Sequence, residues 1–316
     1  MGTMISLKSL RVDYEDVNAV KDIDLEISAG QIYGLVGPNG AGKTSAIKAI
    51  AGILEPTYGE IKIAGHDLEL EPREALRKLG YMPDFPPVYE NLKVWEYLDV
   101  FAAAYLIPGA QRAGKVKHWL KKVSLSEKHD ALIKDLSRGM RQRLILAKTL
   151  LPDPQVLILD EPASGLDPLA RKQMRDILKE AAAEGKTILI SSHILTELSE
   201  FCNAVGIMEK GELRVSGSIE EIRVRLGSHK RLTVRLASPT PANVDKVYHF
   251  LGNSKHCASM AKTEKQEINC LFTGSKEDAA WILTQLTLQE TSIYDFTCVE
   301  DDVEDIFLKI GAKEVS

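Results

Sequence analysis

Gly37-Pro38-Asn39-Gly40-Ala41-Gly42-Lys43-Thr44 decides the fold, because this stretch has the pattern G-x-x-x-x-G-K-[ST]. It follows the continuously apolar run 32–36 and opens a helical pattern over 43–53. Glycines let such a loop turn tightly, so successive backbone N–H groups and the positive end of the next helix point at one anion. The sequence therefore predicts a phosphate-binding loop between a buried strand and a helix.

Two side chains give this phosphate loop its chemistry. The Lys43 ammonium would reach the β- and γ-phosphates of a nucleotide, and the Thr44 hydroxyl is a hard oxygen ligand suited to Mg²⁺. A glycine-rich turn without a ligand is the plainer interpretation, but the four fixed positions coincide by chance in only about one chain in a hundred. We expect phosphate binding at Gly37, Pro38, Asn39, Gly40, Ala41, Gly42, Lys43 and Thr44, with Ser45 beside them.

A second apolar run, 156–159, ends in Asp160 and Glu161. Open α/β sheets bind their ligands at the carboxyl ends of the strands. There Asp160 can hold Mg²⁺ directly or through water, and Glu161 can orient and polarise a water that attacks the γ-phosphate. Acids also end strands as ordinary solvated groups, so the pair gains its meaning from the phosphate loop. Together the two elements predict hydrolysis of a nucleoside triphosphate.

Residues 1 to about 225 alternate short β-branched runs with helical patterns, which predicts an α/β domain with a mostly parallel sheet. The continuously apolar runs should be central strands, whereas runs that alternate apolar and polar residues should be half exposed. The first kind comprises 32–36, 156–159 and 187–190, and the second 5–7 and 23–27.

Only helical patterns occur between residues 84 and 151, at 91–106, 112–123 and 137–151. We therefore expect a helical subdomain, at about 85–150, inserted into the sheet domain. From about residue 230 the strand-like and helical segments follow the order βαββαβα, which ends in a helix at 302–311. This order predicts a small α+β C-terminal domain of ferredoxin-like type over 226–316, after a first domain over 1–225.

Composition excludes several classes of protein. The chain has 316 residues, 44% hydrophobic and 27% charged, which is typical of a globular protein. Its net charge of −5 gives no global positive field to hold nucleic acid or an anionic bilayer. The four cysteines form no Cys-x-x-Cys pair, so neither a zinc cage nor a disulfide framework is indicated. No apolar run is long enough to span a membrane, and we expect a cytosolic protein.

Leu136-Ser137-Arg138-Gly139-Met140-Arg141-Gln142-Arg143-Leu144 opens a helix between the phosphate loop and the acids. With GPNGAGKT before it and LILDEPASGLD after it, residues 1–225 closely resemble the nucleotide-binding subunit of an ABC transporter. The resemblance implies a P-loop NTPase core with an antiparallel β subdomain. It also implies ATP and Mg²⁺ as cofactors, a homodimer or paired ATPase subunit, and a separate polytopic membrane permease on whose cytoplasmic side the chain lies. No nucleic acid is expected.

The resemblance also assigns roles to single residues. Ser137 and Gly139 match the segment that closes on the nucleotide of the partner chain, and Asp167 matches the loop that couples the two sites. Tyr14 matches the aromatic that stacks on adenine, although an ordinary strand aromatic is the alternative. His193 matches the switch histidine that reaches the γ-phosphate; a lone histidine would more often be incidental. Asp167 also suits a helix N-cap.

The sequence departs from the family pattern at three positions. Arg138 and Met140 replace a glycine and a glutamine, and variants of this kind favour the exporter branch. Asp84 replaces the glutamine that contacts Mg²⁺, so an acid brings a further negative charge beside the metal site. The following segment, 85–89, is apolar and aromatic, and suits either a loop that docks on the permease or core packing.

Two other functions are compatible with a phosphate loop. Soluble ABC-type ATPases that act on DNA separate the phosphate loop from the segment at Ser137 by a very long coiled coil, and residues 45–136 are too few for one. Those that act on the ribosome usually carry two cassettes in one chain. A nucleotide kinase would not explain the helix opened by Ser137 or the position of His193. The sequence favours the transporter subunit, and its substrate cannot be read from this chain because the permease holds that site.

Overall fold

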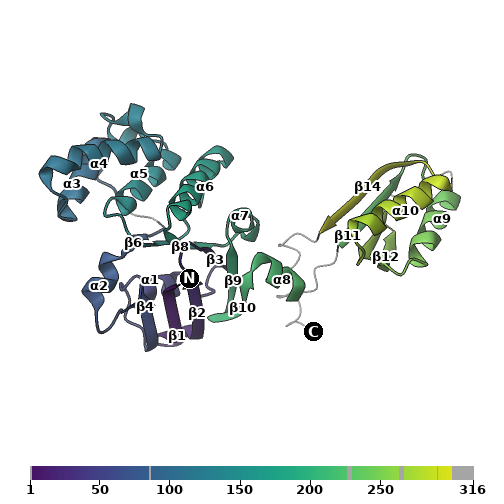
Figure 1. The fold of residues 1–316 in the computed structure, drawn as a ribbon, viewed down its shortest axis with the longest axis horizontal. Coiled ribbons are helices and arrows are strands. Elements are labelled where there is room, and N and C mark those ends of the chain that lie inside the picture. The colour runs from purple at the N-terminus through teal and green to yellow at the C-terminus, as the bar shows by residue number, and fades with distance from the viewer. Residues whose placement is uncertain (1, 85–86, 226–229, 263–266, 290, 301–316) are drawn as a thin grey trace. The chain divides into compact units, whose positions relative to one another are not determined.

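The computed structural model describes residues 2–84, 87–225, 230–262, 267–289 and 291–300 (Figure 1). The chain divides into two compact units, Met1–Ile219 and Glu220–Ser316. Each unit has its own hydrophobic core.

The central sheet of the first unit has the strand order β10-β9-β3-β8-β7-β6. All neighbouring strands pair in parallel except β10, which is antiparallel to β9. Every residue of β3, β7 and β8 is buried, as continuously apolar strands covered on both faces should be. The strands are β3 (Ile32–Val36), β6 (Leu79–Met82), β7 (Val156–Leu159), β8 (Thr187–Ser192), β9 (Ala204–Glu209) and β10 (Glu212–Ser218).

A second, antiparallel sheet has the order β2-β1-β4-β5. The expected strands 5–7 and 23–27 are parts of the longer β1 (Thr3–Tyr14) and β2 (Val17–Ser28). β1 continues through an irregularity around Ser9, whose backbone φ is 48°, and this shift hides the alternation beyond Leu7. The remaining strands are β4 (Tyr58–Ile63) and β5 (His66–Asp67).

Helices alone fill the described chain between β6 and β7, apart from turns and an isolated bridge. The expected helices correspond to α3 (Val94–Ala104), α4 (Gly109–Lys122) and α5 (Arg138–Leu150), which lie together to one side of the central sheet (Figure 1). Short 3-10 turns, η1 (Ser126–Lys128) and η2 (Ile133–Asp135), connect α4 to α5. The other helices up to residue 225 are α1 (Lys43–Ile50), α2 (Pro72–Arg77), α6 (Pro168–Ala183), α7 (Leu195–Ser199) and α8 (Ile219–Arg225).

The second unit has a four-stranded antiparallel sheet of order β12-β13-β11-β14, with α9 and α10 packed on it. The element order βαββαβ and this strand order are those of the ferredoxin-like motif. The elements are β11 (Lys230–Leu236), α9 (Pro241–Gly252), β12 (Cys257–Lys262), β13 (Ile268–Phe272), α10 (Lys276–Leu288) and β14 (Ile293–Glu300). The expected helix at 302–311 lies outside the described residues.

These observations confirm the predicted fold class, an α/β core with an antiparallel β subdomain, an inserted helical region and a small α+β unit. In the described part of the chain, no helix has both the length and the apolarity needed to cross a bilayer.

Candidate functional site

A cleft of about 790 Å³ opens beside the phosphate loop. It brings together segments far apart in the sequence, because the carboxyl ends of β3, β6, β7 and β8 meet at one edge of the sheet. Its lining residues are Tyr14, Val17, Asn18, Ala19, Asn39, Gly40, Ala41, Gly42, Lys43, Thr44, Ser45, Asp84, Glu161, Ser164, His193, Lys210 and Gly211. Most of the predicted site residues therefore share one cleft.

Close backbone contacts explain two glycines of the phosphate loop. A Cβ added to Gly42, whose φ is 99°, would lie 2.1 Å from the Ala19 carbonyl oxygen. A Cβ on Gly37 would lie 2.2 Å from the carbonyl oxygen of Met208. α1 follows with no acidic residue in its first turn, so the positive field of its N-terminus is left for an anion.

Lys43 is buried at the base of the cleft. Its Nζ donates hydrogen bonds to the carbonyl oxygens of Gly37 (2.7 Å) and Pro38 (3.2 Å), and lies 3.7 Å from Glu161 Oε1. Burial lowers the pKa of Lys43, and the carboxylates of Glu161 and Asp160 offset only part of this effect by raising the pKa. The ammonium is thus held by the same loop that would bind phosphate.

Glu161 is held in an unusual backbone conformation, with a φ of 48° in the left-handed region. Its Oε2 lies 2.8 Å from His193 Nδ1, and its backbone N–H donates to Ser191 Oγ at 2.9 Å. The Ser191 hydroxyl in turn donates to Asp160 Oδ1 at 2.7 Å. The two acids and His193 therefore form one connected group at the ends of β7 and β8.

Oxygen atoms suited to a hard cation cluster beside this group. Thr44 Oγ1 donates to Asp160 Oδ1 at 3.4 Å, and Asp84 Oδ1 is buried with no hydrogen-bond partner among the residues that the structure describes. Burial, and then the carboxylates of Asp160 and Glu161, raise the pKa of Asp84, whereas Arg138 and His193 lower it.

This donor set fits Mg²⁺ that is held partly by a nucleotide. Among the described residues, no group of three or more His, Cys, Asp and Glu side chains could hold a metal ion by itself. Mg²⁺ is commonly bound by one or two carboxylates completed by phosphate and water oxygens. A hydroxyl, a buried carboxylate and an unpartnered carboxylate oxygen match that requirement.

Tyr14 lies at the rim of the cleft, on the antiparallel sheet. The residue is 43% exposed, and its hydroxyl is 3.3 Å from Ser45 Oγ. An aromatic that is held at one end and open on its face offers a stacking surface for a base.

Ser137, Gly139 and Asp167 lie outside the cleft of their own chain, whereas Gly37, Pro38 and Asp160 do not line it but contact residues that do. Ser137 is exposed and caps α5 by accepting a hydrogen bond from the Met140 N–H (3.3 Å), and Asp167 caps α6 through the Ala170 N–H (2.7 Å). Gly139 is buried, and a Cβ there would lie 2.7 Å from the Ala170 Cβ. Its glycine is therefore explained by the packing of α5 against α6.

Sequence reasoning missed Ser191, which holds both acids in place. The sequence did hold an indication, since Ser191 is the residue before the last in the apolar strand β8, close to the position that Asp160 takes after β7. Hydroxyl residues are common at such positions, however. It also missed the cleft wall formed by Asn18, Ala19, Lys210 and Gly211, which comes from contacts between distant segments.

Comparisons with known proteins give one family. The family model described as ABC transporter matches residues 20–164. The chain is 38% identical to an uncharacterised ABC transporter ATP-binding protein of Nostoc sp., over 70% of this chain and 65% of that protein. It is 35% identical to the Nod factor export ATP-binding protein I of Cupriavidus metallidurans, over 70% of this chain and 73% of that one.

Similarity extends over nearly the whole chain in another relative. The bacitracin transport ATP-binding protein BcrA of Bacillus licheniformis is 32% identical over 98% of both chains. Among solved structures, an ATP-binding subunit of an ABC transporter superposes with a TM-score of 0.65 and 32% identity, covering 71% of this chain and 94% of that one. The chain therefore belongs to the ATP-binding proteins of ABC transporters, a family of ATPases.

Proposed function

We propose that ATP is bound and hydrolysed in the cleft beside the phosphate loop, and that this hydrolysis drives transport through a separate membrane permease. The observation that carries the proposal is the position of Glu161, which contacts both the Lys43 ammonium and His193 in the cleft beside the phosphate loop. A base at that position is within reach of a water beside a γ-phosphate bound by the loop.

Each residue of the group has a distinct role in this proposal. Lys43 neutralises the β- and γ-phosphates, and Glu161 accepts a proton from the attacking water. His193 holds the Glu161 carboxylate in one orientation through its 2.8 Å contact. Ser191 fixes Asp160 and the backbone of Glu161 relative to each other.

Mg²⁺ would be held by Thr44, Asp160 and Asp84 together with nucleotide and water oxygens. When bound, the ion neutralises negative charge on the β- and γ-phosphate oxygens. Tyr14 would stack on the adenine, and Asn39 to Ser45 would surround the phosphates.

We propose a homodimer, or a pair with a similar ATPase chain, as the active form. Ser137 and Asp167 cap helices at the protein surface and do not line the cleft of their own chain. The N-terminus of α5 has no acidic residue in its first turn, so its positive field suits the γ-phosphate of a partner chain.

A polytopic permease is the proposed membrane partner, with the chain peripheral on the cytoplasmic face. Exposed apolar side chains of the helical region support this, among them Tyr89, Val100 and Leu106. Phe85 and Pro86 of the predicted docking segment lie outside the described residues, and Pro87 and Tyr89 are exposed. The name of the Nod factor export relative favours export. Co-expression with a permease from the neighbouring reading frame tests the assignment: a complex that copurifies from membranes with stimulated ATPase supports it.

We propose that residues 1–225 are the nucleotide-binding domain, with the helical subdomain at about 85–150, and that 226–316 are an accessory domain. The division into compact units near residue 220 supports this boundary. BcrA matches along 98% of its length, so this relative carries a similar C-terminal region.

Asp84→Gln is expected to raise the Mg²⁺ concentration that gives half-maximal ATPase activity, with ATP affinity changed less than ~2-fold. The acid adds a charged oxygen ligand for Mg²⁺, whereas the phosphate loop supplies most contacts to ATP. An Mg²⁺ titration of ATPase activity measures the effect, and Asp176→Asn, at an exposed position of α6, is the matched control. An unchanged or lower half-saturating Mg²⁺ in Asp84→Gln would mean that Asp84 does not hold the ion.

A further inference from the structure

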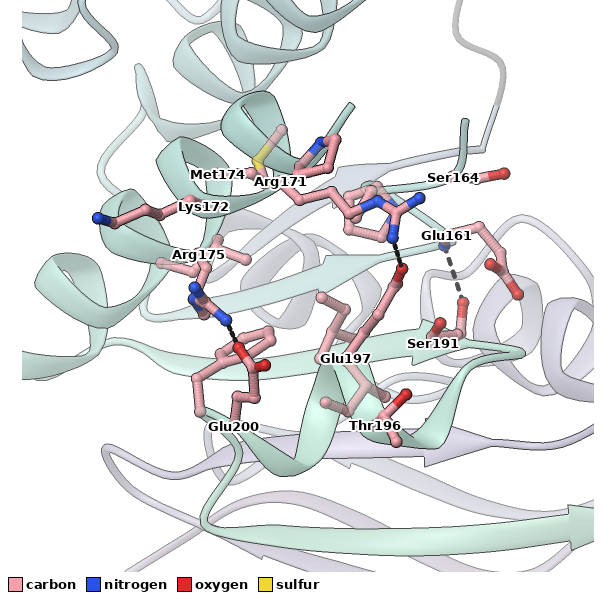
Figure 2. A pocket seen from close by; sticks show the side chains of 18 residues that line it. Glu161, Ser164, Arg171, Lys172, Met174, Arg175, Ser191, Thr196, Glu197 and Glu200 are labelled. Atoms are coloured by element: carbon pink, nitrogen blue, oxygen red, sulfur yellow. Dashed lines mark hydrogen bonds and ion pairs between the residues drawn. The ribbon is translucent and has the colours of Figure 1, made fainter. Parts of the chain in front are cut away.

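A second cavity, of about 380 Å³, lies between α6 and α7 (Figure 2). Apolar side chains line part of it, including Met174, Leu178 and Phe201. Glu161 and Ser191 also line the cavity, and the hydrogen bond from the Glu161 N–H to Ser191 Oγ lies at one end of it (Figure 2). The cavity thus separates the helix that follows the loop 164–167 from the helix that follows His193.

Two ion pairs bridge this cavity. Arg171 Nη1 on α6 lies 2.5 Å from Glu197 Oε1 on α7. One turn further along α6, Arg175 pairs with Glu200, the residue after α7. Figure 2 shows the pairs side by side across the same gap.

The Arg171–Glu197 pair has an additional contact that the Arg175–Glu200 pair lacks. Arg171 Nε donates a hydrogen bond to the carbonyl oxygen of Leu166 at 3.0 Å. Leu166 belongs to the loop 164–167, the segment that matches the coupling loop between two ATP sites. Within the described residues, Arg175 has no hydrogen bond to that loop. One guanidinium therefore touches both the loop and α7.

α7 determines where His193 lies. The helix begins at Leu195, two residues after His193, and its Leu198 packs on the central strand β3, with Cδ1 2.9 Å from the position of a Cβ on Gly34. The Ile194 N–H donates a hydrogen bond to Ser192 Oγ at 3.0 Å, which restrains the short connection between β8 and α7. A displacement of α7 would therefore change the 2.8 Å contact between His193 and Glu161.

We propose that Arg171 is a positioning residue that couples the loop 164–167 to His193 through Glu197. The inference rests on the proposed function of Glu161 and His193. A guanidinium is a rigid planar fork, so a shift of the Leu166 carbonyl moves the group that holds Glu197. When the loop 164–167 contacts a second chain, the shift passes through Arg171 and Glu197 to α7 and changes the alignment of His193 on Glu161. Arg171 itself contacts neither His193 nor Glu161.

Arg171→Lys is the first test. Lysine keeps a positive charge that can pair with Glu197, but it lacks the planar fork of donors of a guanidinium. No single group then contacts both the Leu166 carbonyl and Glu197. We expect kcat to fall about 5-fold or more, with KM for ATP within ~2-fold, because alignment is lost while ATP contacts remain. Arg175→Lys on the same helix is the matched control, and its kcat should stay within ~2-fold of the parent.

A charge swap distinguishes coupling of the loop 164–167 to His193 from an ion pair that only stabilises the packing of α6 against α7. Arg171→Glu with Glu197→Arg restores an ion pair but leaves no donor for the Leu166 carbonyl at position 171. We expect the melting temperature to recover towards the parent value and kcat to stay low. Recovery of kcat in the swap, or equal kcat losses in Arg171→Lys and Arg175→Lys, would overturn the proposal. Glu161→Gln is assayed alongside: if it hydrolyses ATP at the parent rate, the assigned site itself has failed.

Discussion

Glu161→Gln is expected to hydrolyse ATP at least ~100-fold more slowly than the parent while still binding ATP and Mg²⁺, because the amide keeps the shape of the carboxylate but cannot accept a proton from water. The amide can also keep the contact to His193. Steady-state ATPase rates and equilibrium nucleotide titration measure the two quantities. Glu180→Gln, an exposed position on α6, is the matched control and should retain the parent rate.

The same variant tests the proposed dimer. With hydrolysis blocked, ATP should remain bound between two chains, and size-exclusion chromatography should then show a dimer that ADP does not produce. A variant that hydrolyses at the parent rate would remove Glu161 from its role as base. A slow variant that stays monomeric with ATP would leave the base in place and contradict closure of two free chains on ATP.

The parts of the site that could be predicted from sequence are those encoded by neighbouring residues. The phosphate loop, Asp160 and His193 each follow a buried strand directly, and parallel strands bring their carboxyl ends to one edge. Strand register is therefore enough to gather them. The resemblance to ABC transporter subunits, carried by the segment from Leu136 to Leu144, is confirmed by the family comparisons.

Contacts between distant segments could not be predicted in this way. The hydrogen bonds of Ser191 to both acids depend on the side-by-side pairing of β7 and β8. The close packing of Gly139 against Ala170, where a Cβ on Gly139 would lie 2.7 Å from the Ala170 Cβ, likewise joins two separate helices. No sequence pattern pointed to Arg171, because its proposed role depends on contacts with Leu166 and Glu197, which lie on separate segments.

Lys43→Ala is expected to lose high-affinity nucleotide binding while remaining folded. In the bound state Lys43 would be a buried charge paired with phosphate oxygens, and truncating one partner of such a pair costs about 2–5 kcal/mol, or about a 30-fold to 5,000-fold loss of affinity. Fold stability depends much less on it, since its Nζ contacts only loop carbonyls and Glu161 among the described residues. Titration with a fluorescent ATP analogue measures affinity, and the thermal unfolding midpoint reports folding.

Lys48→Ala is the control that isolates this effect. Lys48 lies on the same helix as Lys43 and carries the same charge, but it is exposed in the last turn of α1 and does not line the cleft. Its removal lowers the net charge equally and should leave ATP affinity within ~2-fold of the parent, because an exposed charge at that distance is screened by solvent and salt. Equal losses in the two variants would reduce the role of Lys43 to general electrostatic attraction. Undiminished affinity in a folded Lys43→Ala would show that phosphate is held by the loop backbone and the helix N-terminus without the ammonium.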